Sequence, residues 1–310
     1  MNAGAVTVTL NAALDHSLEC TDFRAGEVNR VTAQWQHAGG KGINVAAFLS
    51  GWVQPVWAAG FLGRDYAAPF EALFRERGIE DRCVRVEGQT RTNLKILHAP
   101  QVTDLNLPGV RIGAQDWEAL QRELVALAQP GRWFVLAGSL PASAPGDAYA
   151  QLVRLLRRAG CPVALDASGS ALRLGVREAP QLIKPNLREL EELVGRGLRS
   201  RAEVLEAARG LVAGGVARVV VSLGAEGALL VEEGRALHAQ PPATQGVSTV
   251  GAGDALLSGV LAGSLRGEGP EACLRRGTAF AAGTLTRPRP TLPPRAELES
   301  LMAQVQVGTG

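Results

Sequence analysis

The sequence contains few lysines and cysteines and has a small net charge. The charge and the cysteines argue against particular classes of protein. Of its 32 lysines and arginines only three are lysines, so arginine supplies nearly all the positive charge. The net charge is only +2 and no basic run stands out, which argues against a nucleic-acid-binding surface. The four cysteines have no metal-type spacing and are typical of reduced thiols in a cytoplasmic protein.

Long hydrophobic runs, targeting segments and a P-loop are missing as well. No apolar stretch approaches membrane-spanning length, and the N-terminus lacks the basic region of a signal peptide. No Gly-x-x-x-x-Gly-Lys-Ser/Thr loop occurs, which argues against a P-loop kinase. We therefore expect a cytoplasmic protein whose partners include neither a membrane nor nucleic acid. A 310-residue chain of ordinary globular composition can build a core without disulfide or metal.

What the sequence does contain is a regular alternation of short β-branched runs and amphipathic segments. Strands are predicted at 6–10, 55–62, 82–86, 133–137, 163–165, 182–184 and 219–221, and helices at 69–77, 115–128, 146–159, 187–194 and 201–213. This order predicts an α/β fold, a doubly wound and mostly parallel sheet with helices on both faces. No repeat or linker divides the chain, so we expect one domain over 1–310. Weaker β segments at about 15–36 and 88–112 are predicted to form a small lid.

The three lysines are candidate functional residues, because a chain so biased toward arginine retains lysine only here. A compact ammonium group can do what a planar guanidinium cannot. Lys41, Lys95 and Lys184 all lie in segments that have other functional signals. The alternative explanation is that these three lysines occur at their positions by chance.

The most informative segment is 248–259, which contains Gly251-Ala252-Gly253-Asp254 followed by an apolar helical pattern. Unobstructed amides at a helix N-terminus favour an anion. An acid beside an anion site repels the anion, so its presence there needs a functional reason. As a base, Asp254 would take the proton from a hydroxyl that attacks phosphorus. The alternative is that Asp254 merely caps the helix.

Two further segments predict recognition of a sugar phosphate. The first is Gly39-Gly40-Lys41-Gly42-Ile43-Asn44, which places backbone without side chains and the Asn44 amide at the start of a helix. This arrangement suits a polyhydroxylated ligand. The alternative is a glycine-rich turn with a solvated lysine. Arg91, Asn93 and Lys95 alternate along a strand and share one face. Two cations on one face repel unless an anion such as a substrate phosphate lies between them. An exposed sheet face is the alternative.

Two segments at strand ends could hold a nucleotide. Asn186 and Glu189 form a helix N-cap with its reciprocal partner, or lie near a hydrated Mg²⁺ that bridges nucleotide phosphates. The glycine-bearing segment 222–227 joins two strands, as a hairpin turn or as a backbone cradle for phosphate or ribose.

Taken together, these segments resemble the phosphofructokinase B (ribokinase-like) family of sugar kinases. Segment 248–259 is similar to the C-terminal signature of the family and 39–49 to its N-terminal signature, and the resemblance runs from Thr9 to the final helix. Five segments are similar to the 1-phosphofructokinase and tagatose-6-phosphate kinase branch: 28–31, 90–93, 103–109, 138–141 and 183–186.

The resemblance implies ATP-dependent phosphorylation of a sugar phosphate, above all of fructose 1-phosphate to fructose 1,6-bisphosphate, with Mg²⁺. It assigns the catalytic base to Asp254 and the anion hole to the amides of Gly251, Ala252 and Gly253. The substrate-binding residues would be Asp15, Gly39, Gly40, Lys41, Asn44, Arg91, Asn93 and Ser139. The nucleotide-binding residues would be Lys184, Asn186, Ser222, Gly224, Gly227 and Gly253, with Asn186 and Glu189 holding Mg²⁺ through water.

Two departures from the family pattern leave questions open. Ala12 stands where the branch usually carries proline, a minor change. Segment 283–290 is unlike the corresponding segment of the family. In relatives that segment helps to shape the adenine pocket and a monovalent-cation loop. The nucleotide preference of this chain and a K⁺ requirement therefore stay open. The alternative functions are kinases of tagatose 6-phosphate, of fructose 6-phosphate, or of an unphosphorylated sugar or nucleoside. A non-catalytic sugar-phosphate-binding regulator is an alternative from another class. The strand edges of the lid suggest a homodimer.

Overall fold

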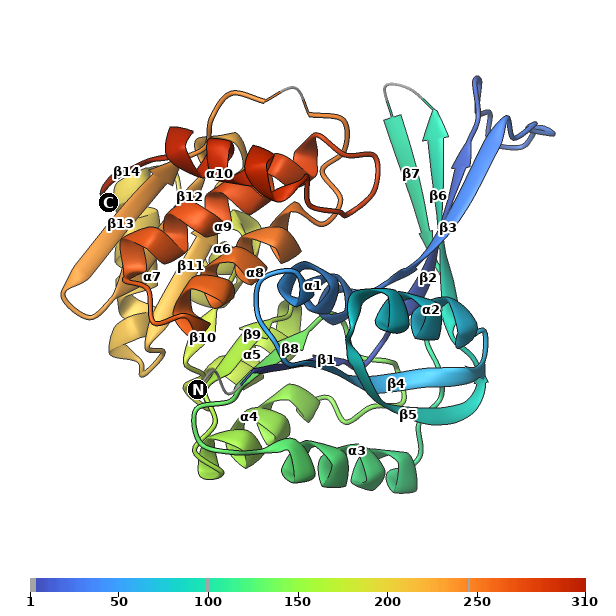
Figure 1. The fold of residues 1–310 in the computed structure, drawn as a ribbon, viewed down its shortest axis with the longest axis horizontal. Coiled ribbons are helices and arrows are strands. Elements are labelled where there is room, and N and C mark those ends of the chain that lie inside the picture. The colour runs from blue at the N-terminus through green and yellow to red at the C-terminus, as the bar shows by residue number, and fades with distance from the viewer. Residues whose placement is uncertain (1–3, 99–100, 245) are drawn as a thin grey trace.

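A computed structural model describes residues 4–98, 101–244 and 246–310, and its centre is a ten-stranded sheet (Figure 1). From one edge to the other the strands are β14 (Gln306–Thr309), β13 (Arg235–Gln240), β12 (Ala228–Glu232), β11 (Arg218–Ser222), β10 (Leu182–Ile183), β9 (Val163–Asp166), β8 (Trp133–Ala137), β1 (Ala5–Thr9), β4 (Val56–Asp65) and β5 (Glu80–Gln89). The seven strands from β11 to β5 pair in parallel, and β12, β13 and β14 extend the sheet antiparallel. The predicted mostly parallel sheet is confirmed.

Helices cover both faces of this sheet because its strands are apolar on both sides. Along β8, Phe134 and Leu136 belong to one core, whereas Val135 and Ala137 belong to the other. The first core includes side chains of α3 (Ala114–Leu127), α4 (Ala148–Arg158), α5 (Gly169–Val176), α6 (Leu187–Val194) and α7 (Arg201–Ala213). The second includes side chains of α1 (Lys41–Ser50), α2 (Ala68–Arg77), α8 (Ala252–Leu265) and α9 (Pro270–Leu285), and α10 (Arg295–Gln304) packs on α9.

A separate four-stranded sheet forms the lid and projects away from the central sheet (Figure 1). Its order is β3 (Ala33–Gly39), β2 (Ala13–Glu19), β6 (Arg91–His98) and β7 (Gln101–Asn106). The predicted lid segments supply these strands, although β3 runs beyond the expected end at residue 36 directly into α1. In the parallel pair β2–β6, Asp15 lies opposite Asn93.

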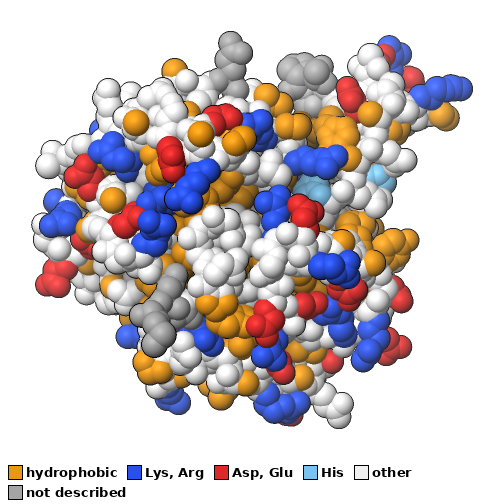
Figure 2. Space-filling view, viewed as in Figure 1, with side chains coloured by type: hydrophobic (Ala, Val, Ile, Leu, Met, Phe, Trp, Pro, Cys, Tyr) orange, Lys and Arg blue, Asp and Glu red, His pale blue; other side chains and the backbone are white. Residues whose placement is uncertain are grey.

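Several element boundaries match the sequence predictions and others do not. The strand at 133–137 and the helices at 187–194 and 201–213 are as predicted. β5 is longer than the expected strand at 82–86, and β14 was not predicted. Among the described residues no helix is long and apolar enough to cross a bilayer. On the face drawn in Figure 2, acidic and basic side chains are interspersed.

Candidate active site

The acid at the start of α8 follows a sharp turn that only glycine makes easily. Gly251 has a left-handed backbone with φ of 79°. A Cβ on Gly251 would lie only 2.6 Å from Cβ of Pro290. Asp254 lies in the first turn of the helix and is buried. Of the three amides predicted to form the anion hole, that of Ala252 also donates a long hydrogen bond to the Thr249 carbonyl, at 3.4 Å.

Asp254 has surroundings that suit a general base. The side-chain amide of Asn44 donates a hydrogen bond of 2.8 Å to its Oδ2 atom. Burial, together with the negative charge of Asp166, raises the pKa of Asp254 to about 6, although Asn44 and two lysines act in the opposite direction. A carboxylate with a pKa near 6 is ionised at neutral pH yet able to accept a proton.

The two lysines near Asp254 share one buried carboxylate, that of Asp166 at the end of β9. Lys41 Nζ lies 2.8 Å from Asp166 Oδ1, and Lys184 Nζ lies 3.3 Å from Asp166 Oδ2. Burial alone would raise the pKa of Asp166, but the two ammonium groups outweigh it and hold the pKa below its usual value. The two ammonium groups therefore face the carboxylate of Asp166 and, when it is ionised, that of Asp254. A Cβ on Gly253 would lie 3.3 Å from Lys184 Nζ, so this ammonium group adjoins the predicted anion hole.

On the lid side, Asp15 is buried and surrounded by donors. Asn93 Nδ2 donates to Asp15 Oδ1 at 3.0 Å, and His37 Nε2 lies 3.5 Å from Asp15 Oδ2. Burial would raise the pKa of Asp15, but His37, Lys95 and Asn93 outweigh it and lower the pKa. A Cβ on Gly39 would lie 2.5 Å from Asp15 Oδ2, so a larger residue there would displace the carboxylate.

The cations of β6 differ in their partners. Lys95 Nζ lies 3.1 Å from Asp104 Oδ1 on β7, so its charge is met within the protein. This pairing corrects the expectation that both cations need an external anion. Arg91 Nη2 donates to the Asn11 carbonyl at 3.2 Å, and the guanidinium has no ion pair with any carboxylate of the described residues. Asn11 Nδ2 in turn donates to Ser139 Oγ at 3.1 Å, which links Arg91 and Ser139 through one residue.

The predicted nucleotide residues lie at the ends of β10 and β11. Asn186 Oδ1 accepts from the Glu189 amide at 2.8 Å, and Glu189 Oε2 accepts from the Asn186 amide at 2.9 Å, so the capping box is present. A β-bridge pairs Asn186 with Ser222. The turn at Gly224–Glu226 is a 3₁₀ turn, and a Cβ on Gly227 would lie 1.9 Å from the Ala239 carbonyl.

The structure thus brings predicted residues together in two groups and adds residues that the sequence did not single out. Asp254, Asn44, Lys41 and Lys184 form one group, and Asp15, Asn93 and Gly39 form the other. Asp166 and His37 were missed as site residues. The position of Asp166 at a strand end was its only signal. No cluster of three or more His, Cys, Asp or Glu side chains arranged to hold a metal occurs in the described part of the chain.

Comparison with known proteins agrees with this geometry. A model described as pfkB family carbohydrate kinase matches residues 6–296. The 1-phosphofructokinase of Rhodobacter capsulatus is 44% identical, covering 100% of this chain and 99% of the relative, and that of Escherichia coli K12 is 40% identical, with 99% of each covered. The structure of phosphofructokinase-2 from E. coli in complex with fructose-6-phosphate has a TM-score of 0.90 at 26% identity, covering 97% of this chain and 98% of that one. The family resemblance and the ribokinase-like fold are therefore confirmed: this chain belongs to the pfkB family of carbohydrate kinases.

Proposed function

We propose that the protein transfers the γ-phosphoryl group of ATP to fructose 1-phosphate and so forms fructose 1,6-bisphosphate. The observation that carries the chemistry is the buried Asp254 with a pKa near 6 beside glycine amides and the Lys184 ammonium. The substrate follows from the names of the relatives that are 44% and 40% identical, both 1-phosphofructokinases. The guanidinium of Arg91, which has no carboxylate partner among the described residues, supports a substrate that already carries a phosphate.

The reaction is a direct displacement at phosphorus. Asp254 accepts the proton of the C6 hydroxyl while the new O–P bond forms and the bond between the γ-phosphorus and ADP breaks. The amides of Gly251 and Gly253, with Lys184, stabilise the negative charge on the transferred group. Lys41 shares Asp166 with Lys184, so we assign it to the transferred phosphoryl rather than to the substrate's own phosphate.

The other end of the sugar phosphate would be held by the lid and by the loop after β8. Asp15 and Asn93 offer an acceptor and a donor to sugar hydroxyls, and Gly39 leaves room for them. Arg91 and Ser139 would bind the substrate phosphate, with the guanidinium as a planar donor. This arrangement directs the hydroxyl farthest from that phosphate toward Asp254.

Mg²⁺ fits the residues at the end of β10 if it keeps most of its water. The Glu189 carboxylate accepts from the Asn186 amide and lies close enough to Lys41 to raise the pKa of that lysine. One carboxylate and one amide suit a hydrated Mg²⁺ better than a closed cage. When bound, the ion would neutralise charge on the ATP phosphates, while Asn186, Ser222, Gly224 and Gly227 hold the nucleotide. Binding of K⁺ and a cytoplasmic location are parts of the same proposal.

A homodimer through the lid is the assembly we propose. The lid and its loops expose apolar side chains to solvent, among them Val28 at 92%, Val102 at 55% and Leu105 at 47% exposure. Exposed apolar side chains on a sheet of four short strands favour association. Sedimentation of a Val28→Asp and Val102→Asp double variant checks this proposal, since a wild-type dimer should become a monomer.

The test of the activity is ADP release across a panel of substrates. We expect fructose 1-phosphate to give the highest kcat/KM among ketohexose phosphates, free hexoses and nucleosides. A higher kcat/KM for tagatose 6-phosphate or fructose 6-phosphate would instead identify that sugar phosphate as the substrate. No ADP release with any of them would favour a binding protein without catalysis.

A further inference from the structure

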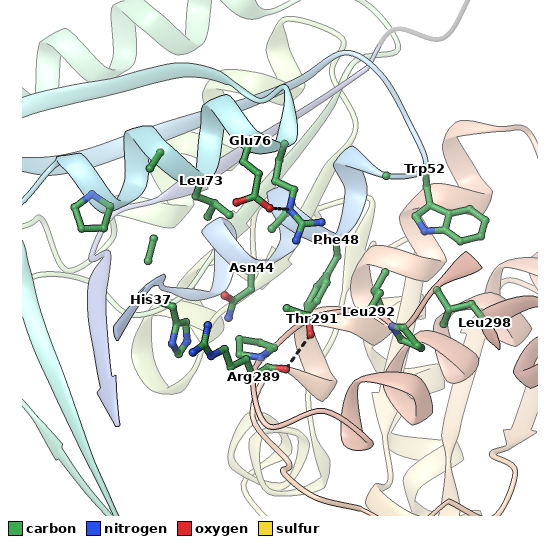
Figure 3. A pocket seen from close by; sticks show the side chains of 18 of the residues that line it. His37, Asn44, Phe48, Trp52, Leu73, Glu76, Arg289, Thr291, Leu292 and Leu298 are labelled. Atoms are coloured by element: carbon green, nitrogen blue, oxygen red, sulfur yellow. Dashed lines mark hydrogen bonds and ion pairs between the residues drawn. The ribbon is translucent and has the colours of Figure 1, made fainter. Parts of the chain in front are cut away.

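A cavity of about 520 Å³ lies next to the catalytic site, between α1, α2, lid strand β3 and segment 289–293 (Figure 3). Its volume is in the range of small-molecule sites. Phe48, Leu73 and Leu292 give it an apolar wall. Asp254, Asp15 and Arg91 do not line it, whereas Asn44 and His37 do, so the cavity adjoins the proposed substrate pocket and shares these two residues with its surroundings.

The cavity contains polar groups that lack partners. Arg77 is paired with Glu76, and Arg295 with Glu299. The side chain of Arg289 has no hydrogen bond or ion pair with any described residue, and Figure 3 shows it extending toward His37 and Asn44. The His37 Nδ1 atom is buried and has no hydrogen-bond partner in the described part of the chain. A cation and an unsatisfied ring nitrogen therefore line the same cavity.

Three residues of the cavity wall also contact the catalytic machinery. Asn44 donates to the base Asp254 at 2.8 Å. His37 lies 3.5 Å from Asp15. Pro290 packs against Gly251, as the 2.6 Å approach of a Cβ at that glycine shows. A ligand in the cavity could therefore shift Asp254, Asp15 and the turn at Gly251 through these contacts.

We propose that this cavity is a regulatory site for a small organic monophosphate. The phosphate would bind to Arg289 and His37, and the carbon skeleton would pack on Phe48 and Leu73. Arg289 and Pro290 belong to segment 283–290, which departs from the family pattern. Its effect on catalysis rests on the proposed kinase function, whereas binding itself does not.

Calorimetry with glycerol 3-phosphate and with inorganic phosphate as probes tests this proposal. Both titrations use protein that carries Arg91→Gln, which weakens phosphate binding at the proposed substrate site. A second substitution is then compared in matched pairs: Arg289→Gln, or Arg287→Gln as the control. Arg287 belongs to the same segment but is paired with Glu297 and does not line the cavity.

We expect Arg289→Gln to weaken binding of glycerol 3-phosphate by roughly 10-fold or more, as for a charge-assisted hydrogen bond, and Arg287→Gln to leave it unchanged. Glycerol 3-phosphate should bind more tightly than inorganic phosphate because its carbon skeleton contacts the apolar wall. Equal binding in both variants, or no binding of either probe, would overturn the site.

Kinase assays then separate regulation from binding. In otherwise wild-type enzyme, glycerol 3-phosphate should change the KM or kcat, and Arg289→Gln should abolish that response while basal activity stays unchanged. Binding that depends on Arg289 without any change in kinetics would overturn the regulatory role but not the kinase function.

Discussion

The two ends of the proposed substrate pocket each hold a buried aspartate, and their surroundings shift the two pKa values in opposite directions. Asp254 has a raised pKa of about 6 because burial and Asp166 dominate. Asp15 has a lowered pKa because His37, Lys95 and Asn93 outweigh burial. A group that must accept a proton and a group that must stay charged to hold hydroxyls need these opposite environments. The contrast supports the proposal that α8 supplies the base and that the lid binds the sugar.

Removing the base should have the largest effect on catalysis. Asp254→Asn keeps the size of the side chain but cannot take a proton, so kcat should fall by ~10²–10⁴. The KM values for sugar and ATP should change little, because the binding residues remain. Steady-state kinetics with both substrates check this, and a kcat close to wild type would remove Asp254 as the base.

The same variant should be more stable than the wild type above pH 6. A carboxylate whose pKa is raised on folding costs no stability below its unfolded pKa of 3.8, and the cost is complete once pH exceeds the folded value near 6. This difference corresponds to roughly 3 kcal/mol in the free energy of unfolding. Urea unfolding at pH 8 and at pH 4 measures it, and an equal gain at both pH values would contradict the buried charge.

Asp166→Asn should change the pKa of Asp254 without altering Asp254 itself, and so bring it closer to the low pKa of Asp15. Loss of the Asp166 charge should lower the pKa of Asp254, so the rise of kcat with pH should move to lower pH. The two lysines lose their shared partner as well, and kcat on the plateau should fall. A pH–rate profile measures both effects. An acid limb that stays near pH 6 would show that Asp166 does not act on Asp254.

At the lid, Arg91→Gln should act on binding rather than on chemistry. Loss of a charge-assisted hydrogen bond to phosphate should raise the KM for the phosphorylated sugar by roughly 10- to 100-fold, with kcat preserved. Lys95→Gln is the matched control, because Lys95 already pairs with Asp104. Equal effects of the two substitutions would contradict the assignment of Arg91 as the phosphate clamp.

The smallest effect is expected for Asn93→Ala, which removes one of three influences that hold the pKa of Asp15 low. His37 and Lys95 remain, so Asp15 stays ionised at neutral pH and the KM for the sugar should rise only a few-fold, in keeping with about 1 kcal/mol per neutral hydrogen bond. The rise should grow as the pH is lowered toward 4. KM values for the sugar at pH 7.5 and at pH 4 measure this, and a pH-independent change would argue against a role through the Asp15 charge.

The sequence allowed prediction of those features that depend on neighbouring residues. Parallel strands and helices follow from hydrophobic periodicity, and the turn before Asp254 follows from two glycines at a helix start. Asp166 was missed because its partner Lys41 is 125 residues away in the chain. The pairing of Lys95 with Asp104 needed the register of the β6–β7 hairpin. Contacts between distant segments carry no local signal, so the electrostatics of the site emerged only from the fold.

The scarcity of lysine has a practical consequence for chemical labelling. All three side-chain amines belong to the catalytic site or the lid, with 37% exposure for Lys41, 17% for Lys95 and 4% for Lys184. A reagent that acylates amines therefore finds, apart from the N-terminus, only one readily accessible target, Lys41, which is ion-paired with Asp166 in the proposed active site. The modification rate of Lys41 would report occupancy by nucleotide or sugar without any engineered probe.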